Sequence, residues 1–343
     1  ILGTSAGFHA VTISLRESGF RFKLDFAWAH PGMRQIFRLM LPAIVGNAAV
    51  QINVMVNTNF ASRLADPVRG PDGPVSWLAY AFRFMQLPLG LFGVAFASAI
   101  LPSVSRSAAA SNFEEFRKTL SRSIGMVFLL TIPSCLGLVV LGRQIVGAIF
   151  QGGRFELYDT QQTAVALSCY AVGLVGYAAT KVLNPAFYAL SDAKTPMFVS
   201  LTSIAVNIVA AELLLTQFHL GIAALALSTS LVAIFACVVL FLVLRRRLGG
   251  IEGRYLVRRF LRISGASIVM IIPVIILSHL MTHWFGTSRW ADLGSVMICL
   301  PVGLVLFTVA ANALGVGEIL VALDAFGRPL RRRLELARAR ILK

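Results

Sequence analysis

Charged side chains are scarce in this sequence. Only 13% of its 343 residues are Asp, Glu, Lys or Arg, whereas soluble domains carry about 25%. Apolar residues make up 57% of the chain, and its mean hydropathy is +0.79. This composition excludes a soluble globular domain and predicts an all-α polytopic membrane protein.

Acidic residues are the scarcest charged group, with 15 Asp and Glu against 31 Lys and Arg. No paired-carboxylate cluster, GxSxG elbow, Walker A loop or HExxH motif occurs, so we expect a protein that is not an enzyme. The net charge of +16 would suit a nucleic-acid partner. Because no zinc-finger spacing and no aromatic RNA-binding motif accompanies it, we expect no nucleic-acid partner.

Cysteine and histidine are also rare. The four cysteines stand singly in apolar runs and are interpreted as small hydrophobic residues: Cys135, Cys169, Cys237 and Cys299. His279 and His283 are spaced to share one helix face, but no third ligand lies nearby in the sequence. We therefore expect no disulfide framework and no metal site.

Long apolar runs dominate the chain. Eight segments approach the roughly 20 residues that cross a bilayer as a helix: 38–62, 75–102, 121–142, 161–190, 196–218, 220–244, 260–282 and 291–313. Prolines interrupt several of them, at positions 42, 88, 133, 185 and 273. Such breaks are tolerated in a membrane where neighbouring helices or a watery cavity satisfy the freed backbone groups.

The basic residues test this arrangement. If the eight segments cross the membrane in turn, 24 of the 31 Lys and Arg fall on the side of the N-terminal segment and the C-terminal tail. Five fall on the opposite side, and Arg83 and Lys181 lie within spans. The positive-inside rule then places both ends of the chain in the cytoplasm. Anionic membrane lipids are the expected partners of the basic clusters.

Arg83 lies within the run AFRFMQLP, about eight residues from the outer end of its span. At 1.5 Å per residue, that places it about 12 Å below the outer membrane surface. A charge at that depth costs about 2.5 kcal/mol or more. Either the side chain snorkels or bonds a neighbouring helix, or it faces a water-filled cavity and binds an anion. Tyr80 and Gln86 make the stretch polar, and Pro88 can interrupt its helix. A guanidinium can donate two parallel hydrogen bonds, which suits phosphate. We favour anion binding.

Lys181 lies midway along VGYAATKVLNPAFYAL, beside Asn184 and Pro185. Either it borders a cavity, or it pairs with a backbone carbonyl or with Glu212 on the following helix. Glu212 is near the end of its span, where we expect it at the membrane interface. Both interpretations of Lys181 remain open.

Several spans carry amide and hydroxyl side chains: Asn53, Asn57, Asn59, Asn207 and Thr229. Interhelical hydrogen bonding is the usual role of such residues in a membrane. The alternative is a monovalent cation site formed by Asn57, Asn207 and Thr229. Because no carboxylate accompanies them, that site would bind a cation weakly.

Four ordered motifs carry a resemblance to a known family. They are LMLPAIVGNAAVQINVMVNTNFAS (39–62), SWLAYAFRFMQLPLGLFGVAFASAILPSVSR (76–106), IFQGGRF (149–155) and KVLNPAFYALSDAKTP (181–196). Together they resemble the MurJ/MviN family of lipid II flippases, in the multidrug/oligosaccharidyl-lipid/polysaccharide exporter superfamily. The resemblance implies two six-helix lobes around a central cavity, followed by two helices that form a lipid groove.

On this resemblance, 38–248 is the second six-helix lobe and 249–313 is the additional helix pair. Residues 1–37 would be the end of a truncated helix and a cytoplasmic linker, and 314–343 a basic cytoplasmic tail. The first lobe of the same protein would be a missing partner, so we expect the chain to be a fragment that does not transport by itself.

The resemblance also implies roles for individual residues. Arg83 matches the cavity arginine that contacts the diphosphate of lipid II, and Gln86 takes a Glu/Gln position. The chain departs from the family pattern where Phe82 replaces an acidic residue and Asn57 replaces a common aspartate. The second departure weakens the expectation of a cation site. Tyr80, Lys181 and Asn184 are further candidate substrate contacts.

The function implied is flipping of lipid II across the bacterial cytoplasmic membrane by alternating access, without a cofactor. Coupling to the membrane potential or to a monovalent ion is expected, and proteins of cell-wall synthesis are possible partners. Two rivals remain: an exporter of another polyprenyl-linked glycan or of a drug cation, and a non-transporting membrane scaffold of wall synthesis.

Overall fold

The structure is a computed structural model that describes residues 31–64, 66–90 and 95–316, most of them helical. Its helices are α2 (Pro31–Arg63), α3 (Asp72–Pro88), α4 (Ala95–Ala109), α5 (Phe113–Phe150), α6 (Leu157–Ala189), α7 (Lys194–Thr216), α8 (Ile222–Arg247), α9 (Gly253–Phe285) and α10 (Arg289–Ala313). The expected helix end and most of the linker, within 1–37, and most of the basic tail lie outside the described residues.

Seven of these helices, α2 and α5 to α10, are long and apolar enough to cross a bilayer. The all-α membrane class is therefore confirmed. The span expected over 75–102 is corrected, because the structure divides it into α3 and α4. Proline has no backbone N–H and clashes with the preceding helical turn, and α3 ends at Pro88.

Helix α5 is longer than expected because its first turn has strong start signals. The Asn112 side chain accepts a hydrogen bond from the Glu115 backbone N–H at 3.1 Å. Glu114 and Glu115 also place negative charge at the positive end of the helix dipole. At its other end α5 continues to Phe150, so Arg143, expected just outside the span, lies within the helix.

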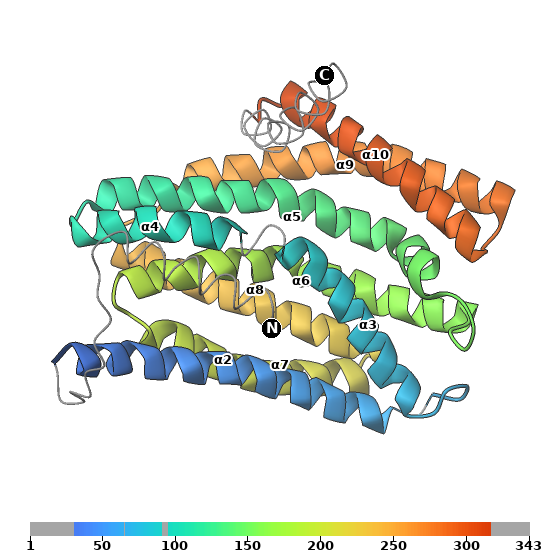
Figure 1. The fold of residues 1–343 in the computed structure, drawn as a ribbon, viewed down its shortest axis with the longest axis horizontal. Coiled ribbons are helices and arrows are strands. Elements are labelled where there is room, and N and C mark those ends of the chain that lie inside the picture. Colours follow the sequence, from blue (N-terminus) through green and yellow to red (C-terminus); the bar gives the residue numbers. More distant parts are fainter. Residues whose placement is uncertain (1–30, 65, 91–94, 317–343) are drawn as a thin grey trace, which may run out of the picture.

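The long helices run side by side, and from α5 to α10 each helix runs opposite to the one before it in the sequence (Figure 1). Helix α2 packs on α7, α7 on α8, α8 on α6 and α6 on α5, while α9 and α10 pack on each other and on α5. One end of the bundle carries the connections after α2, α5, α7 and α9. The opposite end carries the connections after α4, α6 and α8 and is called the basic end, because Lys194 and the clusters within 103–122 and 245–262 gather there.

Helices α6 and α8 approach each other through glycine. A Cβ added at Gly173 would lie 2.7 Å from the Ser230 Cα, and one added at Gly176 would lie 2.8 Å from the Ala233 carbonyl oxygen. Small residues allow this approach, which is how membrane helices gain dispersion contacts. The centre of the bundle depends on both glycines.

Two apolar clusters fill the described part of the chain. The larger surrounds α6 and includes Phe116, Leu167 and Phe187. The smaller joins α5 to the last helix pair and includes Leu129, Ile263 and Phe307. The pair α9–α10 thus has a core of its own against α5, while the boundary expected at residue 248 stays a prediction.

Candidate functional site

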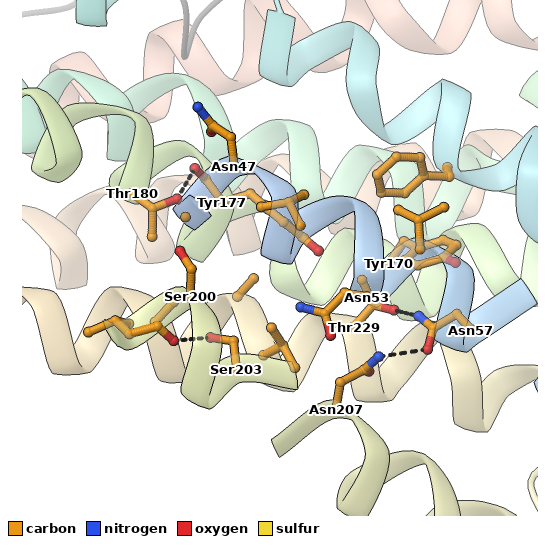
Figure 2. Close-up of a pocket in the computed structure, with 18 of the residues that line it drawn as sticks. Asn47, Asn53, Asn57, Tyr170, Tyr177, Thr180, Ser200, Ser203, Asn207 and Thr229 are labelled. Atoms are coloured by element: carbon orange, nitrogen blue, oxygen red, sulfur yellow. Dashed lines mark hydrogen bonds between the residues drawn. The ribbon is translucent and has the colours of Figure 1, made fainter. Parts of the chain in front are cut away.

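A cavity of about 280 Å³ lies between α2, α3, α6, α7 and α8 (Figure 2). One face of α2 lines it with Asn47, Asn53, Asn57 and Thr58 at helical spacing. The facing helices contribute further polar side chains: Tyr170, Tyr177, Thr180, Lys181, Asn184, Ser200, Ser203, Asn207 and Thr229. Among the described residues that line the cavity, none is a carboxylate.

A chain of hydrogen bonds crosses three helices at one side of this cavity (Figure 2). Asn207 Nδ2 donates to Asn57 Oδ1 at 2.9 Å, and Asn57 Nδ2 donates to Thr229 Oγ1 at 2.5 Å. The Thr229 hydroxyl donates in turn to the Leu225 carbonyl at 2.8 Å. The expectation of interhelical hydrogen bonding is therefore confirmed for Asn57, Asn207 and Thr229. A cation site at these residues stays a prediction.

Three amides of the cavity lining leave an acceptor unpaired. Asn53 Oδ1, Asn184 Oδ1 and Asn207 Oδ1 are buried and receive no hydrogen bond within the described chain. A buried acceptor without a donor costs about 1–3 kcal/mol. The cavity is therefore chemically suited to molecules that donate hydrogen bonds.

Lys181 lines the cavity one helical turn before Asn184. Its side chain is exposed, and it forms no ion pair or hydrogen bond with the part of the chain that is described. Glu212 is also exposed, near the end of α7, so the pair between the two does not form. Of the two interpretations of Lys181, the structure retains the one in which it borders a cavity.

Arg83 and Gln86 do not line this cavity, and their role as substrate contacts stays a prediction. Helix α3 lines the cavity with Val75, Leu78, Ala79 and Phe82, and neither Arg83 nor Gln86 is among the lining residues. Both are exposed. Successive helical residues are about 100° apart, and Phe82 takes the inward position, with its ring centroid 5.6 Å from that of Tyr170. Arg83 thus lies on an exposed part of the α3 surface, here called the rim of α3, outside the cavity lining that contains Lys181.

Tyr80 also lies outside the cavity lining. Its ring centroid is 4.6 Å from that of Phe150 and 5.7 Å from that of Phe155. The Arg83 Cζ lies 5.8 Å from the Tyr80 ring centroid. The nearest ring contacts of Tyr80 are therefore with the last residue of α5 and with the connection that follows it.

An ionic cluster fixes the start of α3 to the start of α6. Arg69 Nε and Nη2 donate to the two Asp159 carboxylate oxygens at 3.1 and 2.7 Å. The buried Trp77 indole donates to Asp159 Oδ1 at 3.0 Å. Hydrogen bonding and attraction to Asp159 raise the pKa of Arg69 above its usual value. Asp159 thus sets the position of the helix that carries Arg83.

The neighbouring Asp66 reinforces this cluster. Its carboxylate accepts hydrogen bonds from the Tyr158 hydroxyl at 2.7 Å and from the Val68 and Arg69 backbone N–H groups. Burial alone would raise the pKa of Asp66, but these donors outweigh it and hold the pKa below its usual value. The connection between α2 and α3 is therefore tied to α6 at two carboxylates.

Comparison with known proteins decides the family. A profile of the family described as "Lipid II flippase MurJ" matches residues 1–293. The chain belongs to the MurJ family.

Relatives in that family cover most of this MurJ-family chain. The "Probable lipid II flippase MurJ" of Bdellovibrio bacteriovorus is 30% identical over 90% of the chain and 57% of its own length. The "Lipid II flippase MurJ" of Burkholderia cenocepacia is 34% identical over 71% of the chain and 46% of its own length. The chain thus spans about half the length of the curated relatives it matches.

Solved structures agree on the fold. A structure described as "Lipid II flippase MurJ, inward closed conformation" matches with a TM-score of 0.63 at 23% identity, covering 88% of this chain and 59% of that one. A multidrug resistance MATE family transporter in an outward-facing conformation matches with a TM-score of 0.54 at 15% identity, covering 90% and 71%. At these identities the likeness shows a shared fold alone.

Two buried polar contacts of the MurJ-family chain escaped the sequence analysis. One is the contact of Trp77 and Arg69 with Asp159, and the other is an ion pair between Arg143 and Asp292. Because the apolar run ends at residue 142, the sequence predicts Arg143 in a connection and not in a helix. The available signal was an acidic residue in the first turn of each partner helix, Asp159 in α6 and Asp292 in α10.

Proposed function

We propose that this chain is part of a flippase that moves lipid II, the undecaprenyl-diphosphate-linked precursor of peptidoglycan, across the bacterial cytoplasmic membrane. The observation that carries the proposal is the match of the MurJ profile to residues 1–293. A charged headgroup cannot cross hydrocarbon without a polar route. The cationic rim of α3 and the amide-lined cavity supply polar groups of the kind required.

Arg83 is the proposed contact for the diphosphate. Its exposed guanidinium makes no ion pair with the described residues, so its N–H donors are available to a ligand. A diphosphate suits the planar fork of an arginine, which can donate two parallel hydrogen bonds. Gln86, one turn further along the exposed rim, is the proposed second donor.

Lys181 and Asn184 are the proposed contacts for more distant parts of the headgroup. Sugar hydroxyls and peptide N–H groups are donors, and the unpaired Asn53, Asn184 and Asn207 oxygens are acceptors. The Lys181 ammonium adds a positive charge at the same cavity. The proposal therefore places the diphosphate at Arg83 on the rim of α3, and the sugar and peptide groups of the headgroup in the cavity.

Transport would follow alternating access between two lobes, of which residues 38–248 form one and the remainder of the full-length protein the other. The pair α9–α10 would carry the lipid tail beside α5. The basic end would face the cytoplasm and its anionic lipids, in keeping with the positive-inside rule. The membrane potential or a monovalent ion would drive the cycle, and wall-synthesis proteins would receive the product.

The lining of the cavity disfavours export of cationic drugs, because its described residues include Lys181 and no carboxylate. A scaffold without transport would tolerate loss of Arg83, whereas a flippase would not. Export of a different polyprenyl-linked glycan would use the same diphosphate chemistry. Identifying the lipid that accumulates in the test below distinguishes that function from lipid II flipping.

The test is depletion of the native flippase in cells that carry the full-length gene. We expect Arg83→Ala to abolish growth and to leave lipid II in the inner leaflet, and Arg83→Lys to restore both only in part. Arg63→Ala is the matched control, because its guanidinium lies 5.9 Å from the Phe60 ring in a similar contact at the end of α2. Parent-like growth and lipid II flipping with Arg83→Ala would overturn the assignment.

A further inference from the structure

The side of α3 that faces away from the cavity is held by an aromatic cluster, here called the aromatic clamp: Tyr80, Phe84, Phe150 and Phe155. The Phe150 ring centroid lies 4.6 Å from that of Tyr80, 5.4 Å from that of Phe84 and 5.9 Å from that of Phe155. Tyr80 and Phe155 meet edge to face at 5.7 Å and 89°. Tyr80 is therefore enclosed by rings from α5 and from the connection that follows it.

The connection from α5 to α6 holds its own ring in place. Gly152 and Phe155 exchange two backbone hydrogen bonds, at 3.0 and 3.1 Å. Gly153, between them, has φ +61°, a conformation that glycine adopts at little cost. The glycines of the IFQGGRF motif thus form a tight turn that presents Phe155 to Tyr80.

The Tyr80 ring also contacts Arg83. The Arg83 Cζ is 5.8 Å from the Tyr80 ring centroid, within the range of a cation–π contact. Arg83 and Tyr80 are three residues apart and lie on adjacent parts of the helix surface. The guanidinium is exposed, and no carboxylate of the described chain pairs with it.

We propose that Tyr80 is a positioning residue for Arg83, and that the aromatic clamp fixes its ring so that the guanidinium is held ready for the diphosphate. This inference rests on the proposed function. It changes the role expected for Tyr80 from a direct substrate contact to a support for one. It also gives the IFQGGRF turn, 69 to 75 residues from Tyr80 in the sequence, a part in anion binding.

The cation–π contact between Arg83 and Tyr80 distinguishes a positioning role of Tyr80 from simple packing. A ring attracts a cation through its quadrupole, and an aliphatic side chain of similar volume lacks that attraction. Tyr80→Phe retains the ring and removes only the hydroxyl. Tyr80→Leu retains apolar contact and removes the ring.

The experiment measures binding of lipid II to the purified full-length protein in detergent. We expect Tyr80→Leu to weaken binding about threefold to tenfold and Tyr80→Phe to stay within about twofold of the parent. Phe155→Leu, which alters the clamp and leaves Tyr80 and Arg83 in place, should weaken binding about twofold. Phe128→Leu is the matched control, because Phe128 and Phe260 form an edge-to-face pair at 5.6 Å and 78° between α5 and α9.

A double-mutant cycle with Arg83→Gln then decides between positioning and general damage. If Tyr80 acts through Arg83, Tyr80→Leu causes no further loss in the Arg83→Gln background. An equal loss in both backgrounds, or a loss of the same size with Phe128→Leu, would overturn the proposal. If Tyr80→Leu binds lipid II as well as the parent while Arg83→Gln binds it weakly, the positioning role of Tyr80 is overturned and the role of Arg83 stands. Parent-like binding with Arg83→Gln would overturn the proposed diphosphate site itself.

Discussion

The Arg143 guanidinium forms a buried ion pair with the Asp292 carboxylate, and this pair joins α5 to α10. Arg143 Nη2 lies 2.9 Å from Asp292 Oδ1, and Asp292 is 1% exposed. The adjacent Gln144 donates to the Ser278 hydroxyl on α9 at 2.6 Å. A Cβ added at Gly147 would lie 2.2 Å from Asp292 Oδ2, so a residue without a side chain lets the carboxylate approach α5. Polar contacts therefore fasten the last helix pair to the bundle.

Breaking this pair should destabilise the protein. Arg143→Met leaves the Asp292 carboxylate buried without its partner, which typically costs about 3–5 kcal/mol. We expect a lower thermal unfolding temperature in detergent. The control is Arg143→Met combined with Asp292→Leu, which removes both charges and should recover most of the loss. A single variant as stable as the parent would show that the pair does not fasten α10.

Gly176→Ala should destabilise the contact between α6 and α8. The new Cβ would lie 2.8 Å from the backbone oxygen of Ala233, and neither helix can yield locally. Overpacking of this kind costs about 1–3 kcal/mol. Thermal unfolding of the purified protein measures the effect.

Gly137→Ala is the matched control, because a Cβ at this position in α5 meets nothing within 4 Å. Removing a flexible glycine from a helix should leave stability unchanged or raise it by about 0.5–1 kcal/mol. Equal unfolding temperatures for the two variants would contradict the close approach of α6 and α8.

Asn57→Asp should create a stronger cation site at the hydrogen-bonded chain. The substitution places a carboxylate beside Asn207 and Thr229, which already contact Asn57. Because oxygen ligands that include a carboxylate suit hard cations, we expect Na⁺ to raise the unfolding temperature of this variant more than that of the parent. Binding to the folded state at a concentration 100 times Kd stabilises by about 2.7 kcal/mol.

The comparison is made in NaCl and in choline chloride at equal ionic strength. Asn59→Asp is the control, because Asn59 is exposed on the same helix, away from the cavity lining. If Na⁺ shifts Asn57→Asp no more than Asn59→Asp, these three residues are not suited to a cation.

Acid should weaken the basic end through Asp192. This carboxylate accepts hydrogen bonds from the Lys194 and Thr195 backbone N–H groups at 3.1 Å and from the Thr195 hydroxyl at 2.6 Å, and it pairs with Arg247. Burial alone would raise the pKa of Asp192, but these donors outweigh it and hold the pKa below its usual value.

A folded-state pKa below the unfolded one stabilises the protein above the unfolded value, near pH 4. That contribution is lost as the pH falls through the lower, folded-state pKa. The parent should therefore lose more stability than Asp192→Asn between pH 5 and acid pH, measured as unfolding temperature against pH. Parallel curves for the two proteins would exclude this role of Asp192.

Much of the fold followed from the sequence. Apolar length and the distribution of Lys and Arg predicted a bundle of membrane helices with its basic connections at one end, because burial in lipid and helix length are local properties of a segment. The sequence also indicates that the amides of α2 and α7 and the Thr229 hydroxyl of α8 are interhelical donors and acceptors. For 75–102, Pro88 indicates a weak point in the helix but does not by itself predict that the helix ends there.

The sequence by itself determined the class of the protein, its membrane helices and the unusual charges within them. The tertiary structure alone decided that Phe82 and not Arg83 faces the cavity, that Asp159 binds Trp77 over 82 residues, and that Arg143 meets Asp292 over 149 residues. Helical periodicity shows which residues share one face, but it does not show which other helix that face meets. The partners of a buried charge depend on the packing of whole helices, which local sequence does not encode.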